Sequence, residues 1–94
     1  MKQGANMAAR LRSKLEAALS PSSLAIEDES AKHAGHAGAR EGGETHFRIR
    51  IVSERFAGLN RVERQRKVYA ALAEELAERV HALSLVTLTP DEAA

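Results

Sequence analysis

An amphipathic helix runs directly into an apolar strand in residues 60–88, which read NRVERQRKVYAALAEELAERVHALSLVTL. Over the first part of this stretch, apolar residues recur at three- and four-residue steps, the spacing of one buried helix face. These residues are Val62, Tyr69, Leu72, Ala73, Leu76, Ala77 and Val80. Asn60 and Glu63 have the spacing of a capping box, so we expect the helix to begin there. From Leu83 onward the composition favours a half-buried strand.

His81 lies at the joint between this predicted helix and strand. Because elements flank it on both sides, we expect a well-anchored backbone, with the ring near the surface and free to face a partner. Upstream, Glu75 and Arg79 are spaced as an i,i+4 ion pair in the favourable order. Arg79 and His81 also suit the negative end of the helix dipole.

Shorter patterns come before the long helix. Apolar residues repeat at helical steps over residues 6–19, which predicts a first helix ending at Ser20-Pro21. Alternation predicts one strand over residues 24–28 and a second over residues 45–52. In the second strand, the side chains expected to face inward are Phe47, Ile49 and Ile51.

The connecting segments complete a single α+β domain. Residues 31–43 hold four of the six glycines and no large apolar residue, which predicts a flexible loop between the two strands. A bend or short helical turn is expected over residues 53–59, disorder over residues 1–5, and a frayed tail or short helical turn over residues 90–94. The predicted architecture is a three-stranded sheet with two helices on one face, covering Phe47, Ile49, Ile51, Leu83 and Leu85.

The composition of the chain limits the classes of function that it can have. The chain has 94 residues, a net charge of +1 and no cysteine, so it offers no global attraction to nucleic acid and no thiolate of its own. The first residues lead into no apolar segment, so we expect no signal peptide, no membrane span and a cytoplasmic location. Ser30 and His33 are close in sequence but have no orienting acid or oxyanion hole, so we do not expect this chain to be an enzyme.

Histidine is the residue type best suited to metal chemistry here. His33 and His36 fall in the glycine-rich loop, His46 opens the central strand, and His81 lies at the joint. Neutral imidazole is a good ligand for zinc, iron or copper. The alternative is that the loop histidines are solvated and that His81 compensates the helix dipole. A closed zinc site normally has four protein ligands, so a metal here would need ligands from another molecule.

Basic residues gather in two places. One group lies in the first two turns of the long helix and the other on the outer face of the central strand; the residues are Arg61, Arg64, Arg66, Lys67, Arg48 and Arg50. They could contact phosphates, and the alternative is an ordinary solvated surface. Residues 35–38 match the GxxG pattern of KH domains, but they are predicted to join two strands rather than two helices.

Taken together, these features resemble the BolA family over most of the chain. The motifs that carry the resemblance are Asp28-Glu29-Ser30 with His33, Thr45-His46-Phe47, Val52-Ser53 with Phe56 and Gly58, Arg64-x-Arg66 with Val68-Tyr69, Glu74-Glu75-Leu76, Val80-His81-Ala82-Leu83-Ser84-Leu85, and Thr89-Pro90. The resemblance implies a class II KH-like fold of order αββαβ. Where the family usually has Arg-His-Arg, this chain has Arg64-Gln65-Arg66.

The resemblance also implies partners. Members of the family pair with monothiol glutaredoxins and can share a bridging 2Fe–2S cluster, to which the glutaredoxin and its glutathione supply thiolates. The family's two histidine ligands fall on His81 and His33, and His36 could take the place of His33. The expected role is iron–sulfur cluster assembly or trafficking and iron-dependent regulation, with no cluster bound by the isolated chain, which would be a monomer or a weak homodimer. The alternative role is a DNA-binding transcriptional regulator that uses the basic helix start.

Overall fold

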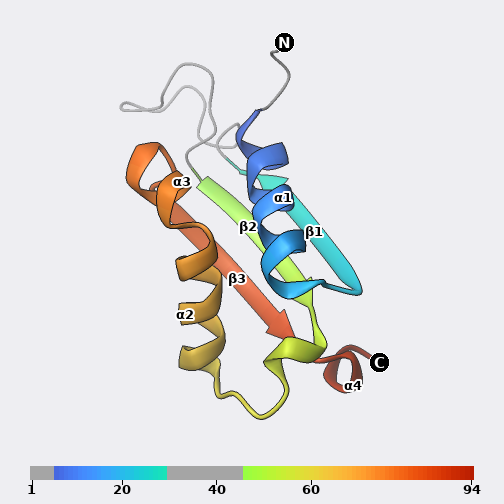
Figure 1. Cartoon of the computed structure of the whole chain (residues 1–94). Coiled ribbons are helices and arrows are strands. Elements are labelled where there is room, and N and C mark those ends of the chain that lie inside the picture. The colour runs from blue at the N-terminus through green and yellow to red at the C-terminus, as the bar shows by residue number, and fades with distance from the viewer. Residues whose placement is uncertain (1–5, 30–45) are drawn as a thin grey trace.

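The structure is a computed structural model, and it describes residues 6–29 and 46–94 (Figure 1). The elements are α1 (Met7–Leu19), β1 (Ser23–Asp28), β2 (His46–Val52), the 3-10 turn η2 (Glu54–Phe56), α2 (Arg61–Ala71), α3 (Ala73–Glu78), β3 (Ala82–Leu88) and α4 (Pro90–Ala93). The predicted α+β architecture is confirmed. The expectations for residues 1–5 and for the glycine-rich loop fall outside the described residues.

Three strands form one mixed sheet in the order β1-β2-β3. β1 pairs antiparallel with β2, and Ile26 lies opposite Ile49. β2 pairs parallel with β3, and Ile49 lies opposite Leu85. Parallel neighbours need a crossover connection, which α2 and α3 provide.

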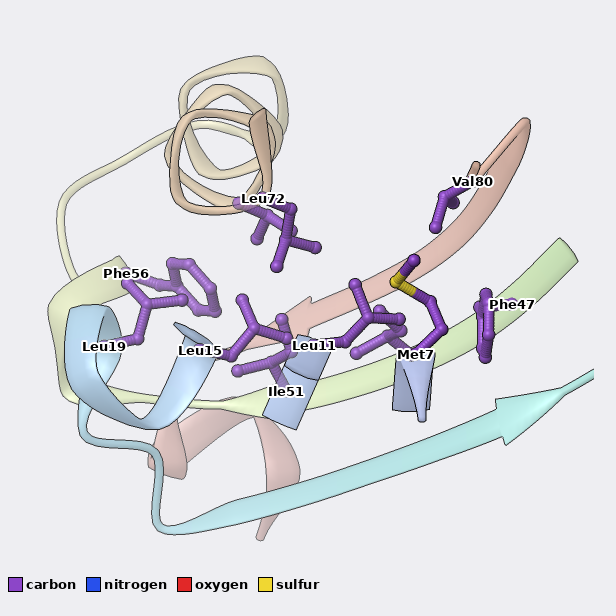
Figure 2. Close-up of a cluster of buried hydrophobic side chains, with 11 residues drawn as sticks. Met7, Leu11, Leu15, Leu19, Phe47, Ile51, Phe56, Leu72 and Val80 are labelled. Atoms are coloured by element: carbon purple, nitrogen blue, oxygen red, sulfur yellow. The ribbon is translucent and has the colours of Figure 1, made fainter. Parts of the chain in front are cut away.

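A single layer of apolar side chains fills the space between the sheet and the helices (Figure 2). Phe47, Ile49 and Ile51 alternate along β2 and are each at most 2% exposed. From the helices above them come Met7, Leu11, Leu15, Leu19, Val68 and Leu72. Leu83 and Leu85 of β3 pack against this core, so the helices cover the face of the sheet that the alternation predicts.

The first helix is capped by polar groups at both ends. The Asn6 side chain accepts a hydrogen bond from the Ala9 N–H at 2.8 Å. At the other end, the buried Ser53 hydroxyl donates to the Leu19 carbonyl oxygen at 2.7 Å. Ser20 adopts a left-handed conformation with φ 44° immediately before Pro21, so the helix ends where the sequence predicts.

The long helix is divided in two, whereas the sequence predicts one helix from Asn60 to Val80. The capping box of Asn60 and Glu63 is present as expected. Leu72, with φ −108° and ψ 19°, separates α2 from α3. Its side chain is fully buried, and alanine-rich neighbours give no local signal of a break. The break therefore coincides with a fully buried side chain and has no local sequence signal.

Four residues placed on the buried stripe by the sequence analysis are exposed: Val62, Tyr69, Ala73 and Ala77. Val62 is 52% exposed and Tyr69 is 41% exposed, whereas Val68 and Leu72 are fully buried. The buried face of α2 therefore follows the i,i+4 row through Val68 and Leu72. The prediction was wrong because Val62 lies six residues before Val68 and Tyr69 one residue after it, which turns both about 100° or more round the helix from Val68. An apolar side chain on a helix need not face the core.

The end of the chain, expected to be a frayed tail or a short helical turn, forms the short helix α4. Thr89 and Glu92 make a capping box, and Pro90 occupies the first helical position, where a missing N–H costs nothing. Among the helices of residues 6–29 and 46–94, none combines the length and the apolar character that a membrane span requires.

The assignment of the buried face of α2 can be tested with two matched substitutions. Val68→Ala should lower the free energy of unfolding by about 2 kcal/mol, because it removes two buried methyl groups from a filled core. Val62→Ala makes the same chemical change at an exposed position and should alter stability by less than about 0.5 kcal/mol. Urea denaturation followed by circular dichroism measures both, and equal losses would contradict the assignment.

Candidate functional site

His81 occupies the link between α3 and β3, with a buried residue before it and a paired strand residue after it. Val80 is 3% exposed, and its N–H donates to the carbonyl oxygen of Glu75 at 3.0 Å. Ala82 opens β3 and lies in register with His46. His81 itself is exposed. Because the residues on both sides are fixed, the imidazole is presented to solvent from an anchored backbone.

The end of β1 and the start of β2 meet beside this joint. Glu29 is the last described residue after β1, and its N–H donates to the carbonyl oxygen of His46 at 2.8 Å. Since β2 and β3 are parallel, His46 and Ala82 open their strands at the same end of the sheet. Glu29 and His46, which flank residues 30–45 in the sequence, therefore both lie at the end of the sheet that carries the joint.

The structure thus brings His46 and His81 to one end of the sheet. His33 and His36 lie outside the described residues, as does the GxxG stretch of residues 35–38. Their positions in the sequence are between Glu29 and His46, the two anchors at the same end as the joint.

No metal site is complete in the part of the chain that the structure describes. Residues 6–29 and 46–94 contain no group of three or more His, Cys, Asp or Glu side chains that could hold a metal ion. The exposed imidazole of His81 is nevertheless a chemically suitable ligand for iron. It fits a site in which the remaining ligands come from elsewhere.

The basic residues are distributed over two sides of the molecule. Arg48 and Arg50 alternate with the buried residues of β2, so they lie on the sheet face turned away from the helices, and both are exposed. The Nε of Arg48 lies 3.3 Å from the carboxylate of Glu29. The cations of α2 belong to the helical layer instead, so the six basic residues do not form one continuous patch.

The side chain of Arg64 makes several intramolecular contacts, a structural role that the sequence did not indicate. Its guanidinium donates to the carbonyl oxygens of Leu59 at 2.9 Å and Thr87 at 3.0 Å. It also donates to both carboxylate oxygens of Glu92, at 2.7 and 3.1 Å, and lies 5.8 Å from the centre of the Phe56 ring. Arg64 therefore joins α2, the end of β3 and α4. Of the four cations predicted at the helix start, the exposed ones are Arg61, Arg66 and Lys67.

A second ionic cluster joins α1 to α3. Glu75 is fully buried, and its carboxylate lies 2.9 Å from Arg10 and 3.1 Å from Lys14. Lys14 also pairs with Glu74 at 2.6 Å, and Arg10 pairs with Glu78 at 2.8 Å. Burial raises the pKa of Glu75, but the hydrogen bonds from Lys14, from its own backbone and from Arg10 outweigh that effect and hold the pKa below its ordinary value.

The sequence analysis paired Glu75 with Arg79 and so missed this cluster. The available signal was a charged residue close to an apolar helix stripe, together with two cations four residues apart on the first helix. Arg10 and Glu75 are 65 residues apart, so spacing alone does not connect them.

Comparison with known proteins decides the family. The family model described as BolA-like protein matches residues 15–92. The chain belongs to the BolA-like family. It is 53% identical over 89 residues to Protein BOLA1, chloroplastic, of Arabidopsis thaliana, a match that covers 93% of this chain and 56% of that protein. It is 45% identical over 83 residues to the DNA-binding transcriptional regulator BolA of Escherichia coli (strain K12), covering 88% of this chain and 75% of that protein.

The BolA-like fold implied by the sequence motifs is confirmed by a solved structure. BolA1 from Arabidopsis thaliana matches with a TM-score of 0.87 and 50% identity, covering 98% of this chain and 100% of that chain. The chain spans little more than half of the full length of the curated protein BOLA1. A cytoplasmic location for this BolA-like chain stays a prediction.

Acid should release α4 from the rest of this BolA-like domain. The hydrogen bonds from the Arg64 guanidinium, and then from the Thr89 N–H, lower the pKa of Glu92 to about 2 from an ordinary value of 4.5. A depressed pKa in the folded chain means that ionised Glu92 stabilises these contacts fully above pH 4.5, and that this stabilisation is lost as the pH falls from 4.5 toward about 2. We expect the protection factors of the α4 amides, which compare the intrinsic with the observed exchange rate at each pH, to fall across this window.

Amide exchange followed by NMR measures the effect, and Glu92→Gln is the control. In that variant α4 should already exchange faster at neutral pH, and the pH-dependent step seen in the wild type should be absent. Equal protection of α4 at pH 6 and pH 2 in the wild type would contradict the assignment.

Proposed function

We propose that this chain is a non-enzymatic partner of a monothiol glutaredoxin, and that it supplies His81 and His33 as ligands to a 2Fe–2S cluster shared between the two proteins. The cluster would be cargo for iron–sulfur assembly or trafficking and a signal for iron-dependent regulation. The observation that carries the proposal is the exposed imidazole of His81 at the end of the sheet where Glu29 and His46 anchor the segment with the loop histidines.

Chain length allows a loop histidine to approach His81. His33 follows Glu29 by four residues, which can span at most about 14 Å when extended. His36 is seven residues beyond Glu29 and ten before His46, so it has at least as much reach. One ligand would then be held on a fixed joint and the other on a glycine-rich segment. Such a pair suits a cluster that is passed on rather than stored.

Imidazole ligands fit a shared cluster chemically. Without cysteine, the chain can offer neutral nitrogen donors, and the glutaredoxin with its glutathione would supply the thiolates. A cluster with histidine in place of thiolate carries less negative charge and has a higher reduction potential, as in Rieske centres. Because imidazole can be protonated, ligation of this kind weakens in mild acid.

Spectroscopy of the reconstituted pair tests the role of His81. The chain, a monothiol glutaredoxin, glutathione, iron and sulfide are combined without oxygen, and the visible circular dichroism is compared with that of the glutaredoxin cluster alone. We expect a distinct mixed spectrum with the wild type and its loss with His81→Ala. His81→Cys should restore binding with a different spectrum, because a thiolate replaces the imidazole.

His46→Gln is the matched control, since His46 lies at the same end of the sheet but is not a proposed ligand. It should retain the mixed spectrum. An unchanged mixed spectrum in the folded His81→Ala variant would refute the role of His81. Separate His33→Ala and His36→Ala variants then show which loop histidine contributes.

DNA binding is the second candidate, favoured by two observations. The Escherichia coli relative is named as a DNA-binding transcriptional regulator. In addition, Arg61, Arg66 and Lys67 are exposed on α2, where they are free of the contacts that hold Arg64. Such cations would contact phosphates, so the affinity would fall steeply with salt.

Fluorescence anisotropy with duplex DNA over a range of salt concentrations tests this candidate. Replacing Arg66 and Lys67 together by Ala should weaken binding and reduce the salt dependence by about two phosphate contacts. Replacing Arg48 and Arg50 by Ala removes the same charge from the opposite side of the sheet and is the control. Equal effects of the two pairs, or no loss with salt, would count against a site on α2.

A further inference from the structure

We infer that Glu75 is a positioning residue for His81: its ion pairs with α1 hold α3 in the orientation that presents the imidazole at the end of the sheet. This inference rests on the proposed role of His81 as a ligand. Glu75 itself would touch neither the cluster nor the glutaredoxin.

The side chain of Glu75 ties α3 to α1. Its carboxylate lies 2.9 Å from a guanidinium nitrogen of Arg10 and 3.1 Å from the ammonium of Lys14. The side chain has no exposed surface, whereas those of Arg10 and Lys14 are 32% and 37% exposed. Two cations on one helix therefore hold a single carboxylate.

The backbone of Glu75 is hydrogen-bonded to the two residues that precede His81. Its carbonyl oxygen accepts the N–H groups of both Arg79 and Val80, each at 3.0 Å. Val80 is buried in the core, and Figure 2 shows its side chain in the apolar layer with those of Met7 and Phe47. A shift of Glu75 would therefore be transmitted directly to the residue adjoining His81.

Helix α3 depends on tertiary contacts for its position. It has six residues and is separated from α2 by the break at Leu72. A helix of this length does not stabilise itself. Glu75 is its one fully buried residue, and Leu76 beside it packs against the core, so the anchor of α3 has an ionic part that contacts α1 directly.

The ionic character of this anchor is what points to positioning. An apolar side chain of similar volume often stabilises a protein as well as a buried ion pair does. A carboxylate held by two charged donors also fixes direction, since each hydrogen bond has a preferred geometry. Glu75 is thus suited to setting the rotation of α3 about its axis, which determines where the link at His81 begins.

The test separates positioning from stability by using an apolar replacement. Glu75→Met keeps the length and burial of the side chain and removes its directional bonds; Glu75→Gln keeps the shape and removes the charge. Ile51→Val, in the core at the other end of β2, is the control for a general loss of stability. Urea unfolding midpoints of the three variants are measured first, so that effects on His81 are compared at known stability.

The first readout uses the isolated chain. The NMR order parameter of the His81 amide should fall from about 0.85 toward about 0.6 in both Glu75 variants and stay unchanged in Ile51→Val. The second readout uses the cluster-loaded pair with a monothiol glutaredoxin. Loss of the cluster to a chelator should be about tenfold faster or more with the Glu75 variants, the range seen when outer contacts of metal ligands are removed.

The outcomes distinguish the inference from the proposed function. An unchanged order parameter for His81 in Glu75→Met would overturn the inference, as would rates of cluster loss that follow only the unfolding midpoints. If His81→Ala leaves the mixed spectrum intact, the proposed function fails, and the order parameter still decides whether Glu75 positions His81. Should Glu75→Gln fail to fold, Glu75→Met carries both readouts.

Discussion

The parallel pairing of β2 with β3 is the constraint that governs this domain. Parallel neighbours cannot be joined by a hairpin, so the chain must cross over the sheet, and α2 and α3 form that crossover. The crossover covers one face of the sheet beside α1, which leaves the outer face of β2 exposed. Parallel strands also begin at the same end, so the joint that carries His81 lies beside the start of β2. The position of the candidate site thus follows from strand direction.

Two ionic assemblies hold the helical layer at opposite ends of β3. At the end of β3, Arg64 joins Thr87 to Glu92 of α4. Before the start of β3, Arg10 and Lys14 of α1 hold Glu75 of α3. Arg64, which the sequence analysis placed among the cations that contact phosphates, therefore serves the fold. The cations of α2 that remain exposed for a partner are Arg61, Arg66 and Lys67.

Patterns formed by residues close together in the sequence predicted the secondary structure well. The capping box at Asn60, the stop at Ser20-Pro21 and the alternation along β2 all depend on residues within a few positions of one another, and the structure has each of them. The errors lie on α2 and α3. Val62 and Tyr69 are apolar but exposed, Glu75 is charged but buried, and the helix is broken at Leu72. Glu75 is buried because Arg10 and Lys14 of α1 pair with it, whereas Val62 and Tyr69 are exposed because they lie on the side of α2 turned away from the core.

The sequence by itself determined the order of the elements, the apolar face of the sheet, the family motifs and the placement of His81 at a joint, because these depend on local spacing and residue type. Only the tertiary structure decided that Arg64 binds Glu92 while Arg61, Arg66 and Lys67 stay exposed, and that Glu75 meets Arg10 and Lys14. It also decided that the joint lies at the end of the sheet where Glu29 meets His46. The physical reason is range: an ion pair between residues 65 positions apart forms only after the sheet and helices have brought them together.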